Sequence, residues 1–112
     1  MEFPTEAQFR DWLDNFDKTT IVGFARSPGS CPLAVCLNDL FHVNGTAYVR
    51  PDKRWADSCW RISEDGSERQ PLPKWANSFA QKVDRTHKAL AGEPVFADEA
   101  LTILNQIHST SD

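Results

Sequence analysis

The sequence predicts an α+β domain with about four helices packed against a small, largely antiparallel sheet of three to four strands. Several segments have the apolar spacing of amphipathic helices, and short β-branched runs lie between turn signals. A third observation is the segment 30–41, which lacks a polar face. A helix that is apolar nearly all round has neighbours on more than one side. We therefore expect the other elements to pack around residues 30–41.

The N-terminal half of the chain begins with a predicted helix over residues 5–16. Thr5 and Gln8 have the spacing of a capping box. The apolar stripe of this helix consists of Phe9, Trp12, Leu13 and Phe16. Residues 19–25 predict a strand, in which Gly23 indicates a close approach of another backbone. A turn over 26–29 then leads to the central helix, with Pro32 at its first position.

The middle of the chain has strand and turn signals. Asn44-Gly45 predicts a hairpin within residues 42–49. Residues 50–57 are a polar, basic connection to a strand over 59–63, in which Trp60 and Ile62 share a face. A turn over 64–67 and a short strand over 68–72 follow. This strand is predicted at an edge of the sheet, because Pro71 bars a central position.

The C-terminal part is predicted to be helical. The longest helix is expected over residues 73–91 and ends at Gly92. Residues 94–96 lead into a last helix over about 97–107, with acidic residues in its first turn. We expect one compact domain over residues 1–108 and a frayed tail over 109–112.

Composition narrows the function classes. The chain of 112 residues has a net charge of −4, which argues against a protein whose whole surface binds nucleic acid. Three cysteines, no readable signal peptide and no apolar run of membrane-spanning length predict a protein of the reducing cytoplasm with no membrane partner. No cofactor is predicted, and the sequence does not indicate the oligomeric state.

One segment has the composition of a binding surface, because residues 48–61 mix basic and aromatic side chains. The candidate binding residues are Tyr48, Arg50, Lys53, Arg54, Trp55 and Arg61. This composition is typical of protein-binding hot spots and also of surfaces that grip single-stranded nucleic acid. Asp52 and Asp57 dilute the charge, which favours a protein partner. A loop whose tryptophans fold back on the core is the simplest alternative.

Catalytic chemistry has one weak candidate, Cys31, at the start of the central helix. A helix N-terminus can lower the pKa of a thiol and favour the thiolate. A base would have to come from His42, His87 or His108, and Asp84, one helical turn before His87, could orient that ring. A buried structural cysteine is the simpler interpretation. The scattered Cys and His residues have no metal-site spacing, so no metal is predicted.

Some motifs resemble those of small uncharacterised bacterial and phage proteins. The matching segments are Cys31-Pro32-Leu33-Ala34, the pattern LPxWAxxFAxxVD from Leu72 to Asp84, and Ala100-Leu101 with Ile103-Leu104. The resemblance covers about half of the chain, consists mostly of packing residues and implies no activity. Together, these patterns favour a small non-enzymatic regulator or inhibitor that binds another protein, and the phage-like motifs fit a protein encoded by a mobile element. The alternatives are a nucleic-acid-binding regulator and a thiol-dependent enzyme.

Overall fold

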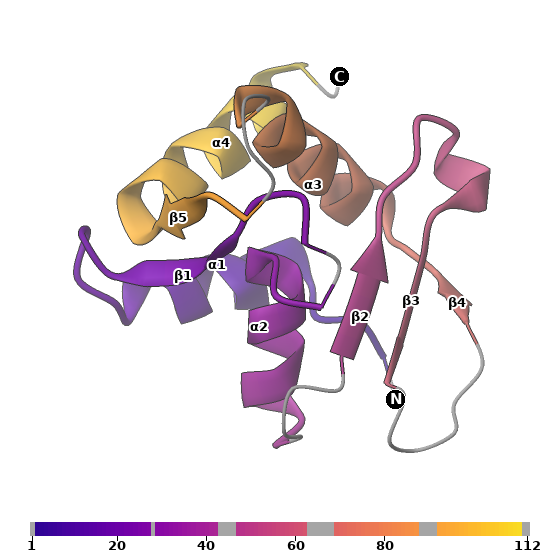
Figure 1. Ribbon diagram of the computed structural model, residues 1–112, viewed down its shortest axis with the longest axis horizontal. Coiled ribbons are helices and arrows are strands. Elements are labelled where there is room, and N and C mark those ends of the chain that lie inside the picture. The colour runs from indigo at the N-terminus through magenta and orange to yellow at the C-terminus, as the bar shows by residue number, and fades with distance from the viewer. Residues whose placement is uncertain (1, 28, 43–46, 63–68, 88–91, 111–112) are drawn as a thin grey trace.

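The computed structural model describes residues 2–27, 29–42, 47–62, 69–87 and 92–110. These residues form α-helices and short antiparallel strands, which confirms the predicted α+β class (Figure 1). In chain order the elements are α1 (Glu6–Asp14), β1 (Ile21–Phe24), α2 (Pro32–Leu40), β2 (Ala47–Arg50), the 3-10 helix η1 (Trp55–Asp57), β3 (Cys59–Ile62), β4 (Gln70–Pro71), α3 (Lys74–Thr86), β5 (Pro94–Phe96) and α4 (Ala97–Thr110).

The strands form two small antiparallel sheets instead of one. β1 pairs with β5, and β3 lies between β2 and β4. β5 was not expected, because the sequence predicts residues 94–96 only as a lead into the last helix. α2 contacts β1 on one side and β2 on the other, and in Figure 1 the two sheets flank this helix.

The core surrounds α2, as its apolar sequence predicts. Leu33, Ala34, Cys36 and Leu37 are each at most 1% exposed, and the helix contacts α1, β1 and β2. Burying a leucine side chain such as Leu33 or Leu37 contributes about 1.5–3 kcal/mol. The expected burial does not reach the end of the helix, where Leu40 is 41% exposed.

Two local predictions near the N-terminus are confirmed. The Thr5 hydroxyl accepts a hydrogen bond from the Gln8 backbone N–H at 3.1 Å, and the Gln8 side chain accepts one from the Thr5 N–H at 2.8 Å. At Gly23, a Cβ atom would lie 2.5 Å from the backbone nitrogen of Pro32. Only a residue without a side chain therefore fits between β1 and the start of α2.

The C-terminal helices differ from the prediction in length. α3 ends at Thr86, so its predicted extent to residue 91 is wrong. His87 leaves the helical conformation at φ −111° and ψ 57°, and its N–H still donates to the Val83 carbonyl. α4 extends to Thr110, beyond the expected end at 107. The predicted turns at 44–45 and 64–67 lie outside the described residues. β2 and β3, which flank the basic connection, pair with each other as antiparallel strands.

Candidate functional site

The basic connection between β2 and β3, residues 51–58, forms an arm beside α3. A buried side chain of α3 anchors it. Asn77 is 4% exposed. Its Oδ1 accepts a hydrogen bond from the Asp52 N–H at 2.9 Å, and its Nδ2 donates to the Asp52 carbonyl at 3.0 Å. Because the amide satisfies both backbone groups, the arm has a defined position against α3.

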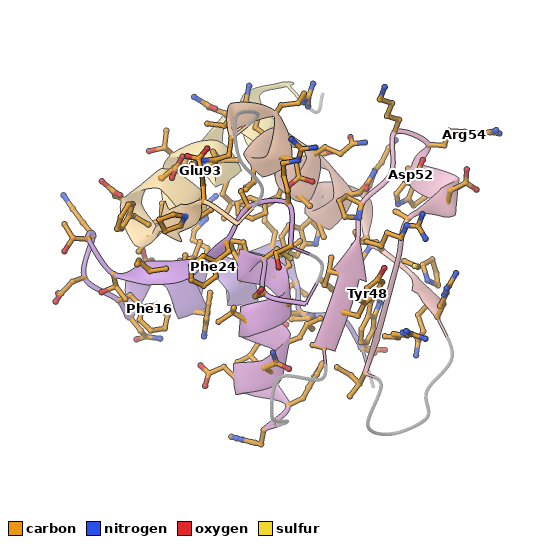
Figure 2. All side chains as sticks on the ribbon, viewed as in Figure 1. Phe16, Phe24, Tyr48, Asp52, Arg54 and Glu93 are labelled. Carbon is orange, nitrogen blue, oxygen red and sulfur yellow. The ribbon has the colours of Figure 1, made fainter. Side chains whose placement is uncertain are left out.

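The outer part of the arm is a tight turn stabilised by its own polar groups. The Arg54 N–H donates to the Asp52 carboxylate at 3.0 Å, and the Ser58 hydroxyl donates to the Trp55 carbonyl at 2.6 Å. The Arg54 side chain is 84% exposed and lies 3.7 Å from the carboxylate of Asp57. Figure 2 shows Arg54 extending away from the molecule. Such an exposed ion pair contributes little to stability.

The aromatic residues of the predicted binding segment lie in different environments. Trp55 is 47% exposed, and its indole N–H donates to the Leu72 carbonyl at 2.6 Å. The ammonium group of Lys74 lies 5.6 Å from the centre of its ring. Trp60, in contrast, is 3% exposed and packs against Phe3 in the core. Of these two tryptophans, only Trp55 is available for contact with a partner.

Tyr48 and Arg61 form a third part of the segment, on the three-stranded sheet. They lie opposite each other in the β2–β3 register. The guanidinium carbon of Arg61 is 5.2 Å from the centre of the Tyr48 ring, which is a cation–π contact. The Nε of Arg61 is buried without a hydrogen-bond partner among the described residues. This pair stabilises the sheet surface and lies outside the hollow described next.

A groove runs between the arm and α3. Its lining residues are Pro51, Asp52 and Lys53 from the arm and Gln81, Asp84 and Arg85 from α3, and its volume is about 670 Å³. Lys53 and Arg85 are exposed. Neither forms an ion pair within the described part of the chain. The Asp52 carboxylate, in contrast, accepts the Arg54 N–H. The groove therefore presents two cations that form no ion pair with a described residue, beside two carboxylates, Asp52 and Asp84, that accept backbone N–H groups.

A smaller cavity of about 250 Å³ adjoins the groove, because Pro51 and Asp84 line both. Its walls come from three elements that the fold brings together. The cavity is lined by Arg26, Ser27, Cys31, Pro32, Leu33, Val49, Arg50, Pro51, Phe79, Ala80, Val83 and Asp84. Most of these side chains are apolar, and the charged ones are Arg26, Arg50 and Asp84.

The turn before α2 forms one rim of the cavity and is conformationally strained. Arg26 has φ 57°, in the left-handed region that non-glycine residues rarely adopt. Its N–H donates to the Asp84 carboxylate at 3.0 Å. Burial raises the pKa of Asp84, while the N–H and the positive charge of Arg26 act in the opposite direction. A left-handed residue costs about 1–3 kcal/mol, and its position at a cavity rim is typical of functional sites.

The thiol of Cys31 lies at the cavity but lacks the features of a nucleophile. The residue is 8% exposed, and burial raises the pKa of its thiol to about 11. Burial therefore outweighs the effect that we expected from the helix N-terminus. The thiol is almost entirely protonated near neutral pH, and this favours a structural cysteine over a catalytic one.

His87 does not supply a base for Cys31 in this structure, because both ring nitrogens are engaged elsewhere. Nδ1 lies 3.2 Å from the Glu93 carboxylate and Nε2 lies 2.7 Å from the Glu99 carboxylate. Burial alone would lower the pKa of His87, but the two glutamates outweigh it and the pKa is raised. The expectation that Asp84 orients this ring is wrong, because the carboxylates of Glu93 and Glu99 occupy both ring nitrogens.

Comparison of the chain with protein-family models finds no match, and searches of curated proteins and of solved structures return no significant similarity. In the described ranges, no three Cys, His, Asp or Glu side chains are arranged to hold a metal ion. No helix among the described residues has the length and apolar character needed to cross a bilayer.

The structure distributes the six predicted binding residues over separate places. Arg50 lines the cavity and Lys53 lines the groove, whereas Tyr48 pairs with Arg61 on the sheet. Sequence reasoning missed the contributions of Arg26 and Arg85 and the anchoring amide of Asn77. The charge of Arg85 on a helix resembles that of any solvated helical face, so no sequence signal distinguished it.

Proposed function

We propose that this protein binds an acidic segment of another protein along the groove between the arm and α3, and acts as a regulator through that contact. The observation that supports this proposal is the set of cations beside the apolar cavity. Arg50, Lys53 and Arg85 line these hollows, and none of them pairs with a carboxylate within the described ranges. Complementary charge steers a partner and selects against wrong ones.

The apolar lining favours a protein segment over nucleic acid. An apolar cavity accommodates a partner side chain as an anchor, and buried anchors supply most of the energy of protein interfaces. Nucleic acid is bound instead through phosphate contacts and stacked bases, which require exposed rings beside the cations. Trp60 is buried in the core, so of these two tryptophans only Trp55 has an exposed ring, and its indole N–H is hydrogen-bonded to the Leu72 carbonyl. The acidic protein segment is therefore the better-supported partner.

The test is a random peptide array probed with the labelled protein and with charge-reversed variants. We expect the bound peptides to be enriched in Asp and Glu and to contain a bulky apolar residue. Lys53→Glu and Arg85→Glu should each weaken binding about tenfold or more, because each replaces an attraction with a repulsion. Arg69→Glu is the matched control, since Arg69 is exposed and lines neither the groove nor the cavity.

Two results would contradict the proposal. One is a bound set without acidic enrichment, or equal loss of binding in the Arg69→Glu control. The other is tight binding to a single-stranded oligonucleotide that falls steeply with salt and is lost in Arg54→Glu. The second result would establish the nucleic-acid alternative, because Arg54 belongs to the arm and not to the groove.

A further inference from the structure

The cavity has the size and walls of a site for one apolar group. Leu33, Val49, Phe79, Ala80 and Val83 line it from α2, β2 and α3, and each is at most 5% exposed. Its volume is about 250 Å³. An apolar cavity of about 150 Å³ accommodates benzene, whereas pockets for drug-sized ligands begin at about 300 Å³. The cavity therefore fits one ring or branched alkyl chain with a short polar extension.

The charges that line the cavity determine what this extension carries. Asp84 accepts the Arg26 N–H at 3.0 Å, and its carboxylate offsets the positive charge of Arg26 within the lining. The cavity is also lined by Arg50, the exposed residue at the end of β2. It forms no ion pair with any described residue. The excess charge of the lining is therefore positive, and a guanidinium binds a carboxylate through two parallel hydrogen bonds.

We propose that the cavity binds an apolar group that bears a carboxylate. The aromatic or branched aliphatic part lies between α2 and α3, and the carboxylate pairs with Arg50. Two sources share this chemistry, a free organic acid and the C-terminal residue of a peptide. The inference rests on the proposed function for the peptide source, because the cavity adjoins the groove that would hold the rest of the segment.

The first experiment is a titration of the ¹⁵N-labelled protein with 3-phenylpropanoate, and the readout is the set of backbone amide signals in NMR spectra. We expect saturable shifts at residues of the cavity wall, such as Val49 and Val83. The uncharged amide of the same acid should bind about tenfold more weakly or worse, because it loses the charge-assisted hydrogen bonds. Equal affinities for the acid and the amide, or shifts that spread over the surface without saturation, would overturn the proposal.

Matched variants test the role of the arginine. Arg50→Gln should reduce the affinity for the acid to that of the amide, and Arg69→Gln should leave it unchanged. Arg50 and Arg69 are both exposed, and each substitution removes one positive charge, so both variants should fold. Ala80→Leu fills the cavity and should abolish binding of the acid. If that variant does not fold, the comparison of the two arginine variants still tests the proposal. Equal affinities of Arg50→Gln and Arg69→Gln for the acid would contradict it.

Peptide ligands distinguish the two sources of the carboxylate and separate this inference from the proposed function. An acidic peptide that ends in phenylalanine is compared with its C-terminal amide, and tighter binding of the free carboxylate identifies the peptide source. A free acid that binds while neither peptide competes identifies the small-molecule source and contradicts the proposed function. If the acidic peptides bind but 3-phenylpropanoate neither binds nor competes, the cavity proposal is wrong and the proposed function stands. If no ligand binds, both are wrong.

Discussion

Gly23→Ala should strongly destabilise the protein, because β1 and the start of α2 are in contact at this position. A Cβ atom at residue 23 would lie 2.5 Å from the Pro32 nitrogen, 2.8 Å from the Pro32 Cα and 2.8 Å from the Cys31 carbonyl carbon. All three are backbone atoms, so no side-chain rotation relieves the clash. Overpacking that forces backbone shifts costs about 1–3 kcal/mol, and more where the backbone is constrained. We expect a loss at the upper end of that range.

Two other glycines provide controls for this substitution. An added Cβ at Gly29 meets no atom within 4 Å. Gly29→Ala should be neutral or stabilise by about 0.4–1 kcal/mol, since it restricts the unfolded chain. Gly92 also has open space but has φ 83°, so Gly92→Ala should cost about 1–2 kcal/mol from backbone strain alone.

The assay is urea unfolding followed by tryptophan fluorescence, with the free energy of unfolding taken from the midpoint and slope. The expected order of stability is Gly29→Ala, wild type, Gly92→Ala and then Gly23→Ala. Similar midpoints for the Gly23 and Gly29 variants would refute the close approach of β1 and α2. Cys31 and Pro32 line the cavity, so the Gly23 variant should also bind ligands of the cavity more weakly.

Three further predictions concern single side chains. Asn77→Ala should cost about 1–3 kcal/mol, because two backbone groups of Asp52 lose their partners, and hydrogen exchange should accelerate at the Asp52 amide. In urea titrations, His87→Gln should cost more stability at about pH 5.5 than at about pH 8.5. Because the pKa of His87 is raised, its contribution to the stability of the fold is fully present below the pKa of the unfolded state and is lost as the pH rises through the pKa of the folded state. An equal loss of stability at both pH values would contradict this prediction. Iodoacetamide should label Cys31 slowly in native protein at neutral pH and rapidly in urea, because its pKa is about 11, whereas rapid native labelling would favour the thiol enzyme.

Local patterns predicted the elements whose signals lie within a few residues. The capping box of α1 joins Thr5 to Gln8, and the apolar face of α2 is continuous in sequence, so both could be recognised without a fold. β5 could not, since three residues directly before a helix carry no strand signal of their own. Its partner β1 lies far away in the chain, and only the tertiary structure pairs them.

The candidate site was less predictable than the fold. Its parts come from the turn at Arg26, from the end of β2 and from α3. The basic composition around Arg50 and Lys53 predicted that the arm matters for binding, and this remains a prediction. The cavity itself arises because three elements do not fill the space between them. No spacing in the sequence encodes such a gap, because it depends on the packing angles of the helices.

The pairing of β1 with β5 has a consequence for the order of folding. Ile21 pairs with Phe96, and α1 and α4 are in contact, so the first and last elements are neighbours in the finished structure. Contacts between remote parts of a chain form slowly, because loop closure costs entropy before the contact is made. During synthesis, β1 therefore lacks its strand partner β5, and α1 lacks its contact with α4, until residues 94–110 have left the ribosome. Until then the surfaces of α1 and β1 that β5 and α4 cover are open to chaperones and to aggregation.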